Sequence, residues 1–247
     1  MQMTHRAALG LALLLAATTA NALTATELVA KNIEARGGGA ALQSVKSLRR
    51  EGRLIVNGGQ YVLELRETKQ RPGSIRTEIS LQGLSQVQAY DGKEGWRIDP
   101  FGGRKDPERM PADDVKEYAE DATIDGVLAD AVAAGSSIEY LGTEDIDGTP
   151  AHKLKVVRND GGLQYVYLDP DYFLEIRVES QRVVRGVKRT SVTDYGNYEK
   201  VGGVFWPLSI ESGIKGAGDP AKFEYQSAVV NPEIDPDYFS FPAQAKQ

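Results

Sequence analysis

The chain has 247 residues and carries 29 Lys and Arg against 35 Asp and Glu, a formal net charge of −6 at pH 7. This acidic balance argues against a nucleic-acid partner, whose phosphates require a basic face on the protein. The chain contains no cysteine, which excludes disulfide bonds, a thiol nucleophile and a lipid anchor attached through cysteine.

The first 22 residues are typical of a secretory signal peptide. Residues 1–6 are weakly basic, residues 7–19 are apolar, and Ala20-Asn21-Ala22 forms a small-x-small cleavage site. We expect cleavage before Leu23 and a mature protein that is soluble in the bacterial periplasm. The alternative, a membrane anchor, is disfavoured because the apolar run is shorter than the roughly 20 residues that cross a bilayer as a helix.

The sequence after Leu23 begins with a predicted helix and continues into strands. Thr24 and Glu27 form a capping-box pattern, and Gly37 supplies a helix stop. From residue 48 to residue 99 apolar and polar residues alternate, with Gly-containing turns between the runs. This pattern predicts an antiparallel meander of about five strands.

Several apolar side chains of this meander are expected to share the inner face of the sheet. Leu63 and Leu65 lie on one face of one predicted strand, and Ile75 and Ile79 lie on one face of the next. Alternation with period two places such residues on the same side of a sheet, so we expect them to face the interior.

The segment YDGKEGWRIDPF, residues 90–101, raises the question of where Trp96 lies. Trp96 and Ile98 share one face of a short strand that follows the Asp91-Gly92 turn, and Pro100 ends it. The tryptophan either fills a core or lines a pocket. Its position just before the helical region favours a pocket, so we expect Trp96 and Ile98 to face the concave side.

A helical insertion is expected between two groups of strands. Residues 101–110 are rich in glycine and charge and predict a loop, while residues 111–135 predict helix. Leu128 and Val132 belong to a narrow apolar stripe on this alanine-rich segment. We expect the stripe to face the interior of the sheet.

Alternation resumes after Gly135 and continues to about residue 230. Leu154 and Val156 alternate with lysines in one run, and Trp206 and Ile210 share a face in another. The order of helix, strands, helical insertion and further strands predicts a mainly β fold, one large and strongly curved antiparallel sheet wrapped around one or two helices. We expect residues 23–247 to form one domain. Tight filling by the helices would give an ordinary core, and loose filling would leave a hydrophobic cavity.

The sequence offers no constellation for catalysis or metal binding. His152 is the only histidine after residue 22, and its place in an alternating run indicates a structural role. There is no Gly-x-Ser-x-Gly elbow and no glycine-rich phosphate loop. Asp145 and Asp147 precede Gly148 and are typical of a turn rather than a calcium loop. Carboxylates are numerous, so an acid/base pair stays open at this level. We expect no catalytic residue, metal or cofactor.

Turn and aromatic patterns along the chain resemble those of the LolA-like superfamily, which includes the periplasmic carrier of outer-membrane lipoproteins. The resemblance rests on Asp91-Gly92 with Gly95-Trp96 and Pro100, on Tyr167-Leu168-Asp169-Pro170, on Gly202-Gly203-Val204-Phe205-Trp206-Pro207, and on Tyr238-Phe239-Ser240-Phe241-Pro242. The resemblance implies an incomplete β-barrel with a helical lid and an apolar concavity that holds acyl chains.

These observations lead to one functional hypothesis with two alternatives. We expect a soluble, monomeric periplasmic carrier that binds acyl chains of a lipoprotein or lipid and moves them toward the outer membrane, between an inner-membrane donor and an outer-membrane acceptor. A lipid-sensing regulatory module is the first alternative, and an unrecognised hydrolase is the second. The side chains expected to line the hydrophobic pocket are Leu63, Leu65, Ile75, Ile79, Trp96, Ile98, Leu128, Val132, Leu154, Val156, Trp206 and Ile210.

Overall fold

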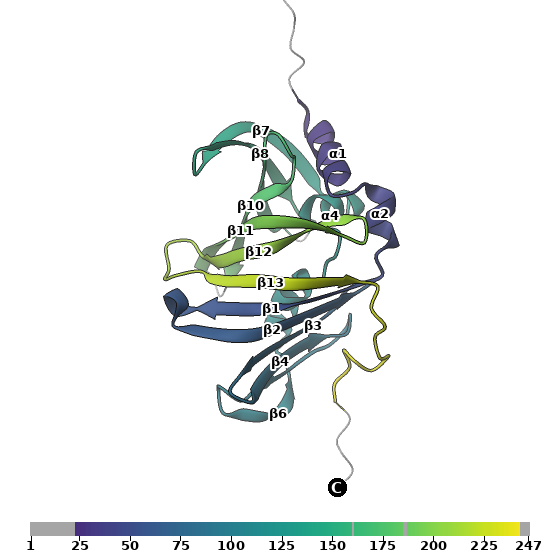
Figure 1. Cartoon of the computed structure of the whole chain (residues 1–247). Helices are drawn as coiled ribbons and strands as arrows, with labels where there is room; N and C mark the ends of the chain where they lie inside the picture. Colours follow the sequence, from purple (N-terminus) through teal and green to yellow (C-terminus); the bar gives the residue numbers. More distant parts are fainter. Residues whose placement is uncertain (1–22, 160, 185–186, 243–247) are drawn as a thin grey trace, which may run out of the picture.

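One antiparallel sheet of thirteen strands forms most of the protein (Figure 1). The computed structural model describes residues 23–159, 161–184 and 187–242, so the expected signal peptide, residues 1–22, lies outside the described residues. The strands are β1 Ser47–Val56, β2 Tyr61–Gln70, β3 Ser74–Leu81, β4 Leu84–Tyr90, β5 Gly95–Asp99, β6 Arg104–Arg109, β7 Ser137–Ile146, β8 Thr149–Val157, β9 Leu163–Leu168, β10 Glu175–Val184, β11 Val187–Val201, β12 Val204–Ile214 and β13 Ala221–Val230.

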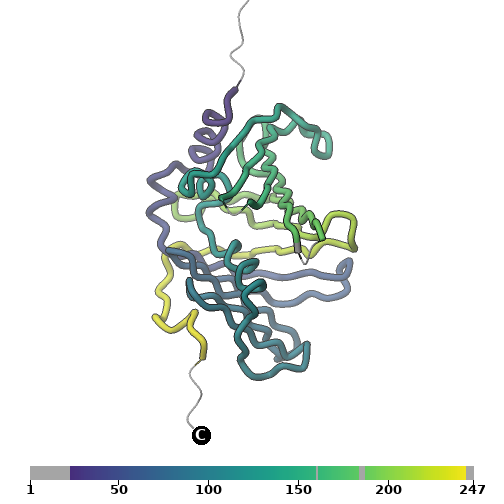
Figure 2. The backbone as a smooth tube through the Cα atoms, turned by 180° about the vertical axis from the view of Figure 1, so that it is seen from behind, coloured from purple at the N-terminus to yellow at the C-terminus, as the bar shows by residue number. Residues whose placement is uncertain are grey.

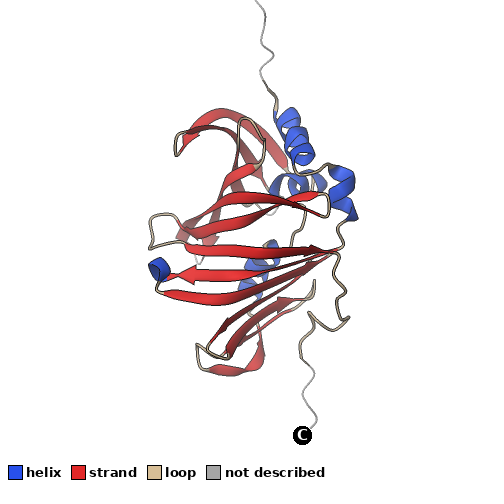
Figure 3. Ribbon diagram, in the orientation of Figure 1, coloured by secondary structure: helices blue, strands red, loops and turns tan. Residues whose placement is uncertain are grey.

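The sheet consists of two meanders joined side by side. The strand order is β6-β5-β4-β3-β2-β1-β13-β12-β11-β10-β9-β8-β7, so β1 pairs with β13 at the seam. The strands at the two ends of this order, β6 and β7, do not pair with each other, and the curved sheet stays open (Figure 3). This confirms the predicted fold class, a mainly β protein with an incomplete barrel.

Helices cover the inner face of the sheet (Figure 2). They are α1 Ala25–Ala35, α2 Gly39–Ser44, α3 Ala112–Glu120 and α4 Val127–Ala133, with a short 3-10 turn η1 at Asn57–Gly59. The predicted capping box of α1 is present, because Thr24 and Glu27 exchange side-chain to backbone hydrogen bonds. Among the described residues, no helix is long and apolar enough to cross a membrane.

Two segments differ from the sequence-based expectation. Residues 104–109 form the edge strand β6 instead of a loop, and Pro107 is tolerated there because an edge strand has one side without ladder hydrogen bonds. The helical insertion is broken into α3 and α4 at Gly126, whose φ is +88°. This left-handed conformation is open to glycine at little cost and interrupts the helix.

Apolar clusters fill the side of the interior that α1, α2 and α4 cover. Leu28 of α1 and Leu128 of α4 pack with Leu154, Val156 and residues of β9 and β10. Leu42 of α2 packs in a second cluster that includes Leu48, Val204 and Trp206. These clusters pack the helices against one end of the strands. The rest of the inner face lines a cavity.

The seam between β1 and β13 depends on a glycine. Gly52 lies at a register shift and pairs with Tyr225. A Cβ atom added at Gly52 would lie 2.0 Å from the carbonyl oxygen of Glu224 and 2.6 Å from Cα of Tyr225. Any side chain at this position would therefore push the two strands apart.

We expect Gly52→Ala to lower the free energy of unfolding by about 1–3 kcal/mol, the usual cost of forcing an extra carbon into a packed site. Gly196→Ala is the matched control, since Gly196 also lies in a strand and its Cβ would meet no atom within 4 Å. Urea denaturation of both variants measures the difference. Equal stability of the two variants would contradict the close approach at the seam.

Candidate functional site

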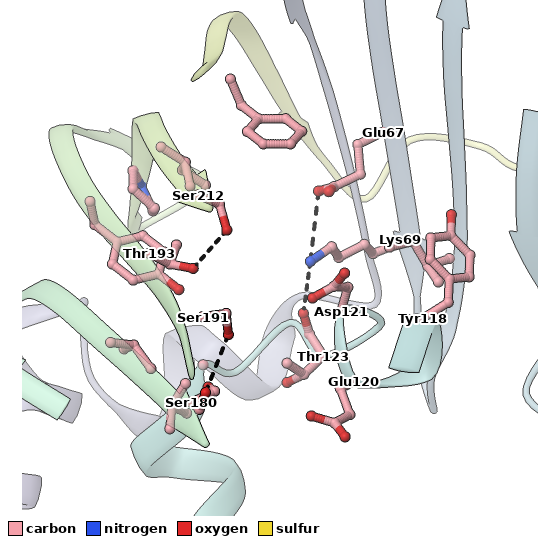
Figure 4. A pocket seen from close by; sticks show the side chains of 18 of the residues that line it. Glu67, Lys69, Tyr118, Glu120, Asp121, Thr123, Ser180, Ser191, Thr193 and Ser212 are labelled. Atoms are coloured by element: carbon pink, nitrogen blue, oxygen red, sulfur yellow. Dashed lines mark hydrogen bonds and ion pairs between the residues drawn. The ribbon is translucent and has the colours of Figure 1, made fainter. Parts of the chain in front are cut away.

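The inner face of the sheet and the α3–α4 segment enclose a cavity of about 1040 Å³ (Figure 4). Strands from both meanders line it, so the cavity exists only because β1 and β13 join them. Its volume is at the upper end of the roughly 300–1,000 Å³ that is usual for small-molecule sites.

One end of the cavity is apolar. Five neighbouring strands contribute one side chain each to it, and all five side chains belong to or pack against one hydrophobic cluster near the β1–β2 and β12–β13 turns. These side chains are Leu54 of β1, Leu65 of β2, Ile79 of β3, Ile210 of β12 and Phe223 of β13, and all of them line the cavity. This end offers a surface for hydrocarbon.

The middle of the cavity is charged. Arg50 pairs with Glu67 at 2.6 Å, and their side chains are only 7% and 13% exposed. Nζ of Lys69 lies 3.7 Å from the Glu67 carboxylate and donates a hydrogen bond to the Thr123 carbonyl oxygen at 3.3 Å. Burial by itself would raise the pKa of Glu67, but the attraction of Arg50 and Lys69 is stronger and lowers it.

Asp121 adds a carboxylate to this charged region. It directly follows α3, and its accessible side chain faces the cavity instead of open solvent (Figure 4). The surrounding protein disfavours the charged form, and the negative Glu67 adds to this, so the pKa of Asp121 rises to about 6 although Lys69 opposes the shift. The cavity therefore holds a carboxylate whose pKa is about 6.

A row of hydroxyl groups lines the wall opposite Lys69 (Figure 4). The Thr193 and Ser212 hydroxyls are 3.0 Å apart, and the Ser191 hydroxyl donates to the Ser180 carbonyl oxygen at 3.5 Å. The Gln164 side chain donates to the Ser180 hydroxyl at 3.1 Å. Hydroxyl and amide groups both donate and accept, so this wall can hydrogen-bond a neutral or charged polar group.

Residues 112–126, which we call the lid, lie over the charged region. Its helix α3 has no buried residue, so hydrophobic packing does not hold it in place. The Tyr118 hydroxyl contacts Thr77 and donates to the Gln88 carbonyl oxygen, each at 2.9 Å. On the other side, Glu120 pairs with Arg158 at 3.1 Å and with Arg182.

The end of the lid is fixed to the sheet and to α1. Both side-chain nitrogens Nη1 and Nη2 of Arg71 contact the Asp125 carboxylate, and Arg36 donates to the Asp125 carbonyl oxygen at 2.5 Å. In the same part of the lid Ala122 and Ile124 are buried, and Ile124 packs in the cluster of Leu42 and Trp206. Water can replace polar contacts at lower cost than it can replace buried apolar packing, so α3 is held less firmly than the segment at Ile124.

The structure brings together some of the predicted pocket residues and separates others. The predicted residues that line the cavity are Leu65, Ile75, Ile79, Trp206 and Ile210. Leu63 packs beside the apolar end in the same cluster as Leu65. Leu128, Leu154 and Val156 are fully buried in the core under α1, and Val132 is exposed on α4. The second strand meander thus supplies more core and fewer cavity residues than expected.

Trp96 and Ile98 lie on the outer face, a correction to the expected concave placement. Trp96 of β5 pairs with Ala89 of β4. Gln88, the residue before Ala89, faces the cavity. Because side chains alternate along a strand, Ala89 and its partner Trp96 face the outer side of the sheet. Its indole Nε1 donates to the Phe239 carbonyl oxygen at 2.8 Å, and its ring meets Phe241 edge to face. The chain after β13 returns to cover Trp96, which is why it is only 2% exposed.

The charged residues of the cavity were not among the predicted pocket residues. Glu67 and Lys69 follow Leu63 and Leu65 at alternate positions of β2, so the same face changes from apolar to charged along one strand. This change is visible in the sequence and was a usable signal. The position of Asp121 depends on the path of the lid, and local sequence carries no comparable signal for it.

His152 and the predicted turns occupy structural positions. The His152 ring stacks on Phe173 and its Nδ1 lies 2.9 Å from the Tyr140 hydroxyl, while burial and the charge of Lys31 lower its pKa. The Asp145 carboxylate accepts a hydrogen bond from the Gly148 N–H at 3.1 Å. Within the described residues, no group of three or more His, Asp or Glu side chains is arranged to hold a metal ion.

Solved structures share this architecture at low sequence identity. A domain named for outer membrane lipoprotein sorting, from Vibrio parahaemolyticus, is 13% identical with a TM-score of 0.59, over 86% of this chain and 94% of that one. A LolA superfamily protein from Nitrosomonas europaea is 16% identical with a TM-score of 0.57, over 88% and 98%. A DUF1329 family protein from Desulfovibrio piger is 12% identical with a TM-score of 0.59, over 87% and 96%.

The protein therefore has a LolA-like fold, as the sequence patterns predicted. Comparison of the sequence with protein families and with curated proteins finds no match. The similarity is therefore one of architecture.

We expect Asp121→Asn to be more stable than the wild type at pH 7 and to lose this advantage as the pH falls toward 4. The pKa of Asp121 is about 6 in the folded protein, above the roughly 3.9 of an unfolded chain. The folded state thus binds the proton more tightly, and the contribution of this group to stability decreases as pH rises from about 4 to about 6.

Urea denaturation of the wild type and the variant at pH 4 and pH 7 measures this effect. Asp106→Asn, which changes an exposed aspartate of the edge strand β6, is the control for the loss of one charge. The interpretation of Asp121 is wrong if the two variants show the same stability difference from the wild type at both values of pH.

Proposed function

We propose that the protein is a soluble periplasmic carrier, without catalytic activity, that holds the acyl chain of a lipid or lipoprotein in the cavity on its way toward the outer membrane. The observation that carries this proposal is a cavity of about 1040 Å³ with an apolar end, under a lid whose helix α3 has no buried residue. The LolA-like fold supports it, since one solved structure with this fold is named for lipoprotein sorting.

The distribution of side chains favours an amphiphile over a plain hydrocarbon. Leu54, Leu65 and Phe223 provide apolar contacts at one end, while Lys69 and Asp121 lie in the middle of the same cavity. Buried charges without polar partners are costly, so a ligand that fills the whole cavity needs polar groups beside these residues. We infer that the chain lies at the apolar end and that the head group lies between Lys69 and the hydroxyl wall.

Affinity can come from the hydrocarbon alone. Transfer of each CH₂ group from water contributes about 0.8 kcal/mol, so a long chain supplies binding energy without any reaction at a catalytic group. Release then requires movement of the lid, and a partner that binds the open form better would shift the equilibrium toward release. The polar contacts of Tyr118 and Glu120 are the interactions that such a partner would replace.

We expect Ile79→Asn to weaken binding of a fluorescent long-chain fatty acid by about tenfold. The amide would face the apolar end of the cavity, and an unpaired amide in contact with hydrocarbon costs about 1–3 kcal/mol. Ile98→Asn is the matched control, because Ile98 is also half-buried in the first meander but lies on the outer face with Trp96. Titration by fluorescence measures both dissociation constants.

The wild-type protein should bind the fatty acid and Ile98→Asn should keep wild-type affinity, after thermal unfolding has shown that both variants fold. Equal weakening by the two substitutions would show that the ligand does not occupy the cavity. No binding by the wild-type protein would contradict the proposed carrier function itself.

A further inference from the structure

A second polar region lies at the end of the cavity that α1 and α4 cover. Arg36, the residue that follows α1, and Glu175, the first residue of β10, both line the cavity there. Each is only 5% exposed, so both charges are removed from open solvent. Arg36 lies over the ring of Trp206, whereas Ile210 of the apolar end is about 13 Å further along the same strand. The two regions therefore occupy opposite ends of the cavity.

An irregular pairing in β10 turns Glu175 into the cavity. Val178 packs in the interior, so regular alternation would place Arg177 and Glu175 on the outer face. The register of β10 with β9 shifts between Glu175 and Arg177, and this irregularity brings the carboxylate inward. Such bulges are common beside functional sites, where they change the direction of a side chain.

Arg36 and Glu175 face each other without direct pairing. A Cβ atom added at Gly126 of the lid would lie 2.0 Å from Nη1 of Arg36 and 3.6 Å from Oε1 of Glu175, so both groups flank the same point. Among the described residues, neither side chain forms an ion pair within 4.0 Å. Two hydrogen bonds in series through one atom span about 5–6 Å. A single bridging atom therefore fits between the two charges.

Both side chains keep hydrogen-bonding capacity that the described residues do not use. The Arg36 guanidinium donates to the Asp125 carbonyl oxygen, and its Nε is buried without a partner. The Tyr198 hydroxyl lies beside Glu175 and donates to its backbone carbonyl oxygen at 2.8 Å. A guanidinium has several more donors, and a carboxylate accepts several hydrogen bonds. Because buried charges without polar partners are costly, this gap favours a bound polar group.

The pair favours a neutral group that both donates and accepts. An anion could accept from Arg36 but would be repelled by Glu175, and an ammonium group could donate to Glu175 but cannot accept from Arg36. The two protein charges cancel, so an added ion would stay unbalanced inside the protein. A hydroxyl oxygen donates and accepts at one atom, which suits the short gap.

This region adjoins the place proposed for the head group. Lys69 donates to the carbonyl oxygen of Thr123 at 3.3 Å, and Arg36 donates to the carbonyl oxygen of Asp125 at 2.5 Å. The Cα atoms of residues two apart lie within about 7 Å of each other. One ligand can therefore contact Lys69 and Arg36 at the same time.

We propose that Arg36 and Glu175 form a subsite for a hydroxyl group, so that the cavity prefers an amphiphile with an uncharged, hydroxylated head group such as a monoacylglycerol. The acyl chain lies at the apolar end and the ester lies near Lys69. A glycerol hydroxyl accepts from Arg36 and donates to Glu175. This inference rests on the proposed carrier function, because it specifies the head group of the ligand that the cavity holds.

Competition against the fluorescent fatty acid tests the subsite in the full chain. Monolauroylglycerol and methyl laurate share the acyl chain and the uncharged ester, but only the first has hydroxyl groups. We expect the wild-type protein to bind monolauroylglycerol at least about tenfold more tightly, because its hydroxyl bonds to two charged groups. Equal affinity for the two esters would overturn the proposal and indicate that water alone fills the gap.

Glu175→Gln keeps the size of the side chain and removes its charge. Hydrogen bonds to charged groups are stronger than neutral ones, so this variant should bind monolauroylglycerol about fivefold more weakly. It should bind the laurate anion more tightly, because Arg36 then lacks a balancing charge, and its affinity for methyl laurate should not change. A general loss of structure would weaken all three ligands together, and that result would contradict the proposal.

Glu179→Gln is the matched control. Glu179 lies on the same strand and its side chain is 13% exposed, but it pairs with Lys215 at 2.8 Å and does not line the cavity. This variant should bind all three ligands with wild-type affinity. The proposal is wrong if Glu179→Gln changes the preference between the two esters as much as Glu175→Gln does.

A second variant serves if thermal unfolding shows that Glu175→Gln does not fold. Glu175→Asp keeps the charge but shortens the side chain, so it should reduce the preference for monolauroylglycerol over methyl laurate. An unchanged preference in a folded Glu175→Asp protein would overturn the subsite. Failure of all three ligands to bind the wild type would reject the carrier function itself, whereas equal binding of the two esters would reject the subsite alone.

Discussion

The pairing of β1 with β13 holds the two halves of the sheet together. It joins residues near the two ends of the chain and turns two separate meanders into one curved sheet. Gly52 permits the close approach of the two strands. On the inner side of this seam, Arg50 pairs with Glu67 on β2 and donates to the Pro207 carbonyl oxygen on β12 at 3.2 Å. One buried arginine thus connects four adjacent strands at the centre of the cavity wall.

The same arginine explains why the cavity is not uniformly apolar. A buried ion pair requires further polar partners, and Lys69, Tyr225 and the cavity itself provide them. The charged region limits the length of the apolar end. The sheet junction and the preference for an amphiphilic ligand that we propose would thus both depend on a single buried pair.

Sequence patterns predicted the fold better than the site. Alternation with period two, hairpin turns and the capping box at Thr24 depend on neighbouring residues, and these patterns predicted the first helix and every strand except β6. Which face of β5 carries Trp96 depends on its register with β4 and on the returning segment at Phe239 and Phe241, about 140 residues away. Likewise, Asp121 reaches the cavity only because Tyr118 and Glu120 fix the lid across the strands. Such long-range arrangements leave no periodic trace in the sequence.

We propose that hydrocarbon occupies the end of the cavity lined by Leu54, Leu65, Ile79 and Ile210. Methyl NMR of the full chain with a fatty acid that carries a nitroxide at the end of its chain can locate the hydrocarbon. We expect strong paramagnetic broadening of the methyl signals of these four residues and none for Ile98 on the outer face. Broadening of Ile98 with sharp signals from Leu65 and Ile79 would contradict it.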